Sequence, residues 1–224
     1  MNYNKVLIDL KKDGISTCPN FIENKKIKIL ISNFDKFLKN KNNVWTDSQN
    51  SDNRIYGIDI LDPIYREIFE SEDLKKIYSN YISSKDKHSF VMANKLEFKK
   101  NNLGSGGGWH RDTFFSKQLK FILYLTDVNH QNGAFEYIPR SHFKSYKLKD
   151  LFFRFKQKNI RRYADKNFKN VIQITGKAGD LIIVDTSGIH RGSPIKKGER
   201  IALTNYLCHH PFSKGVMNQL VKND

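Results

Sequence analysis

The chain has 224 residues, and its 39 Lys and Arg against 23 Asp and Glu give a formal net charge of +16 at pH 7. This length suits one domain whose core can enclose a small-molecule site. The two cysteines, Cys18 and Cys208, form no Cys-x-x-Cys pair and need no disulfide. No segment has the roughly 20 apolar residues of a membrane span, and residues 1–12 lack the apolar core of a signal peptide. We therefore expect a protein of the reducing cytoplasm.

The N-terminal part of the sequence has helical periodicity. Val6, Leu7 and Leu10 repeat at helical spacing over residues 3–12, and Gly14 stands where a helix would end. A short extended piece at residues 15–18 should follow. After a turn, six apolar residues predict a long amphipathic helix: Ile27, Leu30, Ile31, Phe34, Phe37 and Leu38.

Two more segments precede the strands. Residues 45–53 are polar and rich in turn-forming residues, so we expect a surface loop. Residues 63–82 form a second predicted helical region, with core contacts expected at Ile64, Ile68, Phe69, Leu74, Ile77, Tyr78 and Tyr81. Residues 1–87 should therefore be a mainly helical part.

From residue 88 onward the sequence consists of short stretches rich in β-branched and aromatic residues and bounded by turns. Strands are expected at residues 89–92, 95–100, 119–125, 134–138, 171–175, 181–185 and 200–207. Many short strands after helices predict a mostly β, α+β fold, namely a double-sheet jelly roll with the N-terminal helices packed on one side. Because no repeat or linker divides the chain, we expect a single domain over residues 1–224 with the jelly-roll core at residues 88–211.

Residues 143–170 form a basic insert within this core. The insert is crowded with Lys and Arg, interrupted at roughly helical spacing by Leu148, Leu151, Phe152, Phe155 and Ile160, which indicates an amphipathic helix in part of it. One interpretation is a basic lid that meets an anionic substrate over the active site. The other is a solvated charge run on an ordinary connecting helix. The net charge of the chain is compatible with both.

A glycine-rich run at residues 104–108 leads into His110-Arg111-Asp112. Side chains two positions apart on an extended segment share a face, so His110 and Asp112 can bind one ion while Arg111 points away. His190, 78 positions beyond Asp112, offers a third ligand. Two histidines and one carboxylate with open positions beside them are the arrangement of non-haem Fe(II) oxygenases. The sequence therefore predicts a metal site at His110, Asp112 and His190.

The order of the motifs resembles that of the Fe(II)/2-oxoglutarate dioxygenases, and within them the phytanoyl-CoA dioxygenase-like branch. The glycine run ends in Trp-His-x-Asp, and residues 132–142 read Asn-Gly-Ala-Phe-Glu-Tyr-Ile-Pro-Arg-Ser-His. A His-x-Gly-x-Pro stretch begins at His190, ten residues before Arg200. The similarity covers roughly residues 88–210. A lone His-x-Asp is weak evidence, whereas the ordered set is specific.

This resemblance implies a jelly-roll fold, Fe(II) as the metal, and 2-oxoglutarate and O2 as cosubstrates. It also implies that 2-oxoglutarate is decarboxylated to succinate and CO2 while the substrate is oxidised, normally by hydroxylation. In the halogenating relatives a small residue replaces the carboxylate ligand. Asp112 is present here, which favours hydroxylation or a related desaturation or cyclisation.

Arg200 is expected to bind the distal carboxylate of 2-oxoglutarate, because a guanidinium group pairs with a carboxylate through two parallel charge-assisted hydrogen bonds. Thr204 shares a strand face with Arg200 and is a weaker candidate for the same contact. Tyr124 is a further candidate, provided that the face of residues 120, 122 and 124 points inward.

Other residues beside these motifs have more ordinary expected roles. Trp109 and Phe114 should line the site or pack in the core. Arg191 either contacts the substrate or forms a salt bridge. His142 is expected to be structural.

Three functions are compatible with the sequence. The first is an oxygenase that acts on a small, anionic metabolite or biosynthetic intermediate. The second is an oxygenase that acts on nucleic acid or another macromolecule, which the charge permits although no recognition module is present. The third is a non-catalytic basic binding protein on the same fold, against which the complete ligand set argues. The substrate and the oligomeric state do not follow from the sequence.

Overall fold

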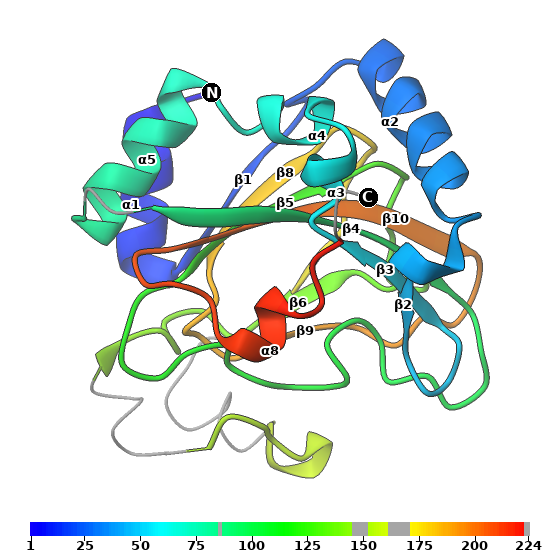
Figure 1. Cartoon of the computed structure of the whole chain (residues 1–224). Helices are drawn as coiled ribbons and strands as arrows, with labels where there is room; N and C mark the ends of the chain where they lie inside the picture. Colours follow the sequence, from blue (N-terminus) through cyan, green and yellow to red (C-terminus); the bar gives the residue numbers. More distant parts are fainter. Residues whose placement is uncertain (85–86, 145–151, 161–170, 222–224) are drawn as a thin grey trace.

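Two antiparallel β-sheets form the centre of the computed structural model, which describes residues 1–84, 87–144, 152–160 and 171–221 (Figure 1). The strand order of the larger sheet is β1 (Ile15–Cys18), β8 (Leu181–Asp185), β5 (Leu119–Tyr124), β10 (Glu199–Cys208), β4 (His88–Glu97), β3 (Asp52–Tyr56) and β2 (Trp45–Thr46). The order of the smaller sheet is β7 (Ile172–Ile174), β6 (Phe135–Tyr137) and β9 (His190–Gly192). Every strand pairing in these two sheets is antiparallel.

The N-terminal helices cover one side of the larger sheet, opposite β6 and β9 (Figure 1). They are α1 (Tyr3–Asp13), α2 (Asn24–Phe37), α3 (Ile58–Leu61), α4 (Ile64–Glu67) and α5 (Glu72–Ile82). The structure also has a 3-10 turn at Lys41–Asn43 and a short helix, α8 (Lys214–Met217), near the end of the described chain. Leu10, Phe34 and Ile77 belong to the same buried cluster as Val91 of β4 and Leu203 of β10. The predicted mostly β fold with helices packed on one side is confirmed.

Local signals explain where the helices begin and end. The side chain of Asn2 accepts a hydrogen bond from the backbone of Lys5 at the start of α1, and Gly14 follows the helix in the left-handed conformation with φ 83°. The predicted helical region 63–82 is divided because Ser71 caps a new helix and accepts a hydrogen bond from the N–H of Leu74.

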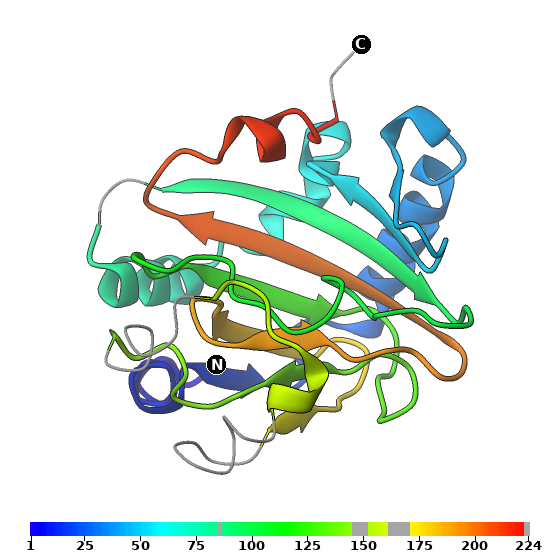
Figure 2. The same cartoon turned by 90° about the horizontal axis from the view of Figure 1, so that it is seen from below.

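Alternation along the strands gives the larger sheet two different faces. On β10, Ile201 and Leu203 join the helix-side core, whereas Ala202 and Thr204 face a cavity on the other side. Strands β4 and β10 run side by side in Figure 2, and their register places Thr204 opposite Met92. This second face of the sheet carries the residues discussed below.

The prediction of a surface loop at residues 45–53 holds only for the turn at residues 47–51 and is wrong at both ends. The segment contains β2 and the beginning of β3, joined by a turn in which Oδ1 of Asp47 accepts hydrogen bonds from the N–H groups of Ser51 and Asp52. Ser51 and Asp52 are buried. The strands were missed because their polar side chains point to a cavity, so the usual alternation of apolar core and polar surface is absent.

Several other boundaries also differ from the expectation. The strands predicted at 89–92 and 95–100 are one continuous strand, β4, and β9, α3 and α8 were not predicted. Residues 145–151 and 161–170 of the basic insert lie outside the described residues. In the part of the insert that the structure describes, residues 157–160 are helical. No helix in the described chain has both the length and the apolar composition that a membrane crossing requires.

Candidate metal centre and cosubstrate pocket

His110, Asp112 and His190 come from two segments whose backbones hydrogen-bond to each other. The N–H of His110 donates to the carbonyl of His190, and the N–H of His190 donates to the carbonyl of His110, each at 2.9 Å. The N–H of Asp112 donates to the carbonyl of Thr186 at 3.0 Å. Because β9 begins at His190 and pairs with β6, the smaller sheet fixes one end of this arrangement. Backbone pairing thus brings together residues that are far apart in the sequence.

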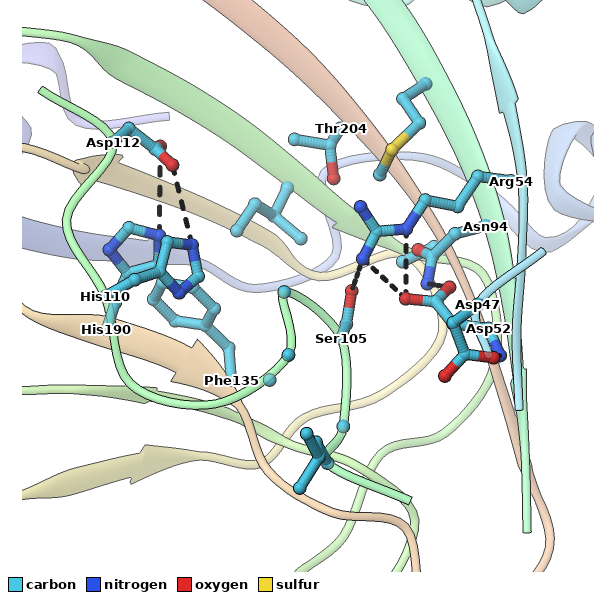
Figure 3. A pocket seen from close by; sticks show the side chains of 18 of the residues that line it. Asp47, Asp52, Arg54, Asn94, Ser105, His110, Asp112, Phe135, His190 and Thr204 are labelled. Carbon is cyan, nitrogen blue, oxygen red and sulfur yellow. Dashed lines mark hydrogen bonds and ion pairs between the residues drawn. The ribbon is translucent and has the colours of Figure 1, made fainter. Parts of the chain in front are cut away.

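The side chains of these three residues converge on one point (Figure 3). Oδ1 of Asp112 lies 3.5 Å from Nε2 of His110, and Oδ2 lies 3.8 Å from Nε2 of His190. The possible ligand atoms of the three residues all lie within 4.8 Å of one another. Adjacent ligands of one ion lie roughly 3 Å apart when each bond is about 2.1 Å long. The triad is therefore close to the geometry of a shared metal ion.

Each imidazole is oriented by a carbonyl two residues earlier. Nδ1 of His110 lies 2.8 Å from the oxygen of Gly108, and Nδ1 of His190 lies 3.0 Å from the oxygen of Gly188. Because a carbonyl only accepts hydrogen bonds, each Nδ1 carries the proton and each Nε2 keeps its lone pair. Nε2 of His190 is buried and has no hydrogen-bond partner among the residues that the structure describes. A metal ion would satisfy it, so the residues present fit an iron site.

The charges around the triad favour metal binding at neutral pH. Burial, reinforced by His110, lowers the pKa of His190 to about 3, so its imidazole stays neutral. Burial alone would raise the pKa of Asp112, but the Lys120 ammonium and the two imidazoles outweigh it, and this pKa lies well below its usual value. Burial would lower the pKa of Lys120, but the Asp112 carboxylate outweighs burial and raises it. Asp112 is therefore an anion and Lys120 a cation.

Gly106 allows the glycine-rich run to pass close to the triad. Its backbone has φ 87°, and a Cβ atom at this position would lie 2.5 Å from Cε1 of His110. Only glycine combines this backbone conformation with this close approach. The described part of the basic insert also hydrogen-bonds to the segment that carries His110. The backbone N–H of Arg111 donates to the carbonyl of Phe153, and the backbone N–H of Phe155 donates to the carbonyl of Trp109.

Arg200 lies in the same cavity as the triad and is buried with 4% of its surface exposed. Nη1 donates to the carbonyl of Gly133, while Nε is buried without a hydrogen-bond partner. No carboxylate in the described chain forms an ion pair with Arg200, and burial lowers its pKa. Leaving a buried cation unpaired is unfavourable, so this guanidinium group is suited to an anionic ligand.

Thr204 and Tyr124, the two weaker candidates for a contact with 2-oxoglutarate, differ in where they lie. Thr204 lines the cavity on the same strand face as Arg200, and its role stays a prediction. Tyr124 does not line the cavity, although Lys120 and Ile122 on the same face do. The hydroxyl of Tyr124 donates to the carbonyl of Ile174 and accepts from the N–H of Phe135. Tyr124 therefore ties the two sheets together, and its contact with the cosubstrate stays a prediction.

The cavity has a volume of about 610 Å³ and extends well beyond the triad. This is within the range of about 300–1,000 Å³ for small-molecule sites. Phe135 forms part of its wall near the triad, since the centre of its ring lies 5.5 Å from that of His190, and Ile122 and Met92 also line the cavity. The cavity can hold a cosubstrate together with part of a second molecule.

Arg54 is the main cavity residue that the sequence analysis missed. Nε and Nη2 of Arg54 donate to Oδ2 of Asp52, and Nη2 also donates to Oγ of Ser105 (Figure 3). Nη1 donates to the hydroxyl of Tyr56. The guanidinium group lies 4.9 Å from the ring centre of Trp45. Arg54 thus joins β3 to the glycine-rich run. If residues 52–56 had been taken as a strand, the alternation of side chains would have placed these polar side chains on one face.

The other residues singled out from the sequence have packing or pairing roles. Trp109 is buried outside the cavity and donates from Nε1 to Gln157. Arg191 forms an ion pair with Glu136 at 2.5 Å and lies over the Trp109 ring, so the salt-bridge alternative is the one observed. Phe114 is buried and does not line this cavity.

Several solved structures share the fold of this chain. The epimerase SnoN of nogalamycin biosynthesis, described as non-heme and alpha-ketoglutarate-dependent, is 12% identical with a TM-score of 0.70, over 92% of this chain and 82% of SnoN. HygX from Streptomyces hygroscopicus, with nickel and 2-oxoglutarate bound, is 13% identical with a TM-score of 0.66, over 91% of this chain and 85% of HygX. AviO1 from Streptomyces viridochromogenes Tue57 is 14% identical with a TM-score of 0.65, over 92% and 95%. No curated protein sequence matches the chain.

These likenesses show the fold, which is similar to the double-stranded β-helix of 2-oxoglutarate oxygenases. The family follows from the sequence itself. The profile of the phytanoyl-CoA dioxygenase (PhyH) family matches residues 10–200, and the chain belongs to this family. The resemblance inferred from the motifs is therefore confirmed, and the predicted Fe(II), 2-oxoglutarate and O2 are the cofactors of the family.

Proposed function

We propose that this protein is an Fe(II)/2-oxoglutarate-dependent oxygenase that hydroxylates a small, anionic metabolite or biosynthetic intermediate. The proposal rests on two buried groups in one cavity that lack a partner in the described chain. One is Nε2 of His190, which has no hydrogen-bond partner, and the other is the guanidinium group of Arg200, which has no carboxylate beside it. A metal ion would bind the nitrogen, and the distal carboxylate of a 2-oxo acid would pair with the guanidinium group.

In this proposal each residue has a defined task. His110, Asp112 and His190 would hold the iron from one side, with the neutral imidazoles presenting Nε2. Arg200 would pair with the distal carboxylate of 2-oxoglutarate, and Thr204 would add a hydroxyl to the same contact. When bound, iron and 2-oxoglutarate supply the oxidising chemistry, in which O2 is reduced, 2-oxoglutarate becomes succinate and CO2, and the substrate gains a hydroxyl group.

The chain itself orients the reactants and keeps water away from them. Ile122, Met92 and Phe135 give the cavity an apolar wall, and each of them is buried. Such a wall excludes water from the reacting centre and strengthens the charge contacts made inside it. We further propose that the whole chain is one domain, since α1 and α2 share a buried cluster with β5, β8 and β10.

The negative charge of the substrate is supported less directly than the class of reaction. The overall charge of +16 favours anions, but inside the cavity Arg54 is neutralised by Asp52 and Lys120 by Asp112. Arg154, from the basic insert, is exposed at the cavity and donates to the carbonyls of Gly106 and Gly107. We propose that the insert meets the anionic substrate at this rim, with Arg154 as the first contact.

The test begins with metal-free protein under anaerobic conditions. Addition of Fe(II) and then 2-oxoglutarate should produce the weak visible charge-transfer band of the chelated cosubstrate. Asp112→Ala should abolish the band, and Arg200→Ala should require far more 2-oxoglutarate to produce it. Asp127→Ala is the matched control, because among the described residues this exposed carboxylate pairs only with Lys177 and the N–H of Ala178. Folded parent protein that binds no iron would end the oxygenase proposal.

Substrate screening follows once the band is established. Succinate release would be measured with phosphorylated, carboxylated and uncharged metabolites at matched concentration. Stimulation mainly by anions, with a loss of stimulation in Arg154→Ala, supports the substrate proposal. Stimulation mainly by uncharged compounds contradicts the anionic part and leaves the reaction class intact.

A further inference from the structure

Lys120 is a buried lysine of β5 whose ammonium group faces the metal centre. The residue is 6% exposed, and Nζ lies 2.6 Å from Oδ2 of Asp112. It stands opposite Tyr206 in the β5–β10 register, and Nζ lies 4.3 Å from the centre of that ring. Removing an ammonium group from water is unfavourable unless the group is paired. Asp112 and the face of Tyr206 therefore hold Lys120 at this position.

The ammonium group engages one particular oxygen of the carboxylate. Lys120 contacts Oδ2 of Asp112, whereas Oδ1 is the oxygen that lies 3.5 Å from Nε2 of His110. A carboxylate can bind a metal through one oxygen or chelate it through two. With Oδ2 held by Lys120, Oδ1 is the oxygen left for the metal.

The difference between these two binding modes matters for a 2-oxo acid oxygenase. An octahedral ion with three protein ligands has three free positions, of which a chelating 2-oxo acid takes two and O2 takes the third. If Asp112 chelated the ion, one of these positions would be lost. The cosubstrate and O2 could then not be bound together.

We propose that Lys120 is a positioning residue that holds Asp112 in one-oxygen ligation and so keeps a coordination position open beside the bound 2-oxo acid. The inference rests on the proposed function, because it concerns the same iron site. A lysine that merely stabilised the fold would affect unfolding and leave the coordination of the metal unchanged. The two roles therefore differ in a spectroscopic readout.

Nitric oxide is the probe for the open position, because it binds ferrous iron where O2 would and gives an EPR signal without turnover. Parent protein loaded with Fe(II) and 2-oxoglutarate should bind nitric oxide and show the signal of the nitrosyl complex. Lys120→Met should keep the visible band of 2-oxoglutarate and lose the nitrosyl signal in its presence, while still binding nitric oxide when 2-oxoglutarate is absent. Lys120→Arg, which keeps a cationic donor, should retain the signal. Lys120→Leu replaces the Met variant if that variant does not fold.

Lys117→Met is the matched control, because Lys117 lies just before β5 and donates to the carbonyl of Tyr81 instead of to Asp112. It should behave like the parent. The inference is overturned if Lys120→Met or Lys120→Leu binds nitric oxide beside 2-oxoglutarate as the parent does. It is also overturned if Lys120→Arg loses the signal as completely as the apolar variants. Absence of the 2-oxoglutarate band in the parent would instead contradict the proposed function, so the two failures are distinguishable.

Discussion

The hydroxyl of Tyr81 on α5 donates a 2.8 Å hydrogen bond to Oδ2 of Asp185 at the end of β8. Oδ1 of the same carboxylate accepts from the N–H of Ser187, and both Tyr81 and Asp185 are buried. This contact links the helical layer to the loop that leads to His190. The helices therefore support the proposed metal site through one buried hydrogen bond.

Tyr81→Phe should destabilise the protein, because it leaves one oxygen of a buried carboxylate without its donor. We expect the free energy of unfolding to fall by about 1–3 kcal/mol. Urea unfolding at constant pH measures the change. Tyr3→Phe is the control, since the Tyr3 hydroxyl makes no hydrogen bond with the described residues. Equal stability of the two variants would show that the Tyr81 contact contributes nothing.

Gly106 and Gly198 offer a matched pair of substitutions. Gly106→Ala and Gly198→Ala both introduce a side chain at positive φ, 87° and 73°, and each should cost about 1–2 kcal/mol of stability. A Cβ at Gly106 would lie 2.5 Å from Cε1 of His110, whereas at Gly198 it meets nothing within 4 Å. Only Gly106→Ala should therefore also weaken Fe(II) binding, measured by anaerobic titration. Comparable Fe(II) affinities in the two variants would contradict this.

Arg200→Lys should weaken 2-oxoglutarate binding while leaving Fe(II) binding unchanged. Lysine keeps the charge but cannot form two parallel hydrogen bonds with one carboxylate. Losing one charge-assisted hydrogen bond of about 1.5–3 kcal/mol raises the Kd for 2-oxoglutarate by about 10- to 100-fold. The visible band measures this Kd, and Arg154→Lys at the rim serves as the control. An unchanged Kd would remove Arg200 from the cosubstrate pocket.

The metal-free protein should lose stability in mild acid because of His190. Burial lowers the pKa of this residue to about 3, whereas a solvated histidine has a pKa of about 6.5. Between these values the unfolded chain binds a proton that the folded chain does not. The contribution of His190 is therefore fully present above about pH 6.5 and is lost as the pH falls.

At about pH 5 this loss amounts to up to about 2 kcal/mol. Urea unfolding of the metal-free parent and of His190→Gln at neutral pH and in mild acid measures it, and the variant should show the smaller change with pH. His130→Gln, which alters an exposed histidine, should keep the parent's dependence. A pH dependence in His190→Gln as large as that of the parent would contradict the assignment.

The proposed ligand residues could be read from the sequence because their spacing has a direct geometric meaning. His110 and Asp112 are two positions apart on an extended segment, which places both on one face. The ordered motifs around them pointed to the family, and the family profile confirmed it. The end of the first helix at Gly14 was likewise readable, because capping depends on neighbouring residues alone.

The hairpin of β2 and β3 was not readable in the same way. Asp52, Arg54 and Tyr56 face the cavity, while Ile55 is buried on the helix side. A strand whose inner face lines a polar site lacks the apolar alternation that identifies most strands. Asp52 was therefore placed in the predicted loop at residues 45–53, and Arg54 and Tyr56 were assigned to no element.

By itself the sequence determined the residue types available for iron and 2-oxoglutarate, the helical N-terminal layer and the antiparallel β core. Only the tertiary structure decided how the charges are distributed among partners. It paired Lys120 with Asp112 and Arg54 with Asp52, and it left Arg200 buried without a carboxylate. The physical reason is that helices and strands depend mainly on residues that are close together in the sequence. Charge pairing depends instead on the distances in space between side chains that the fold brings together.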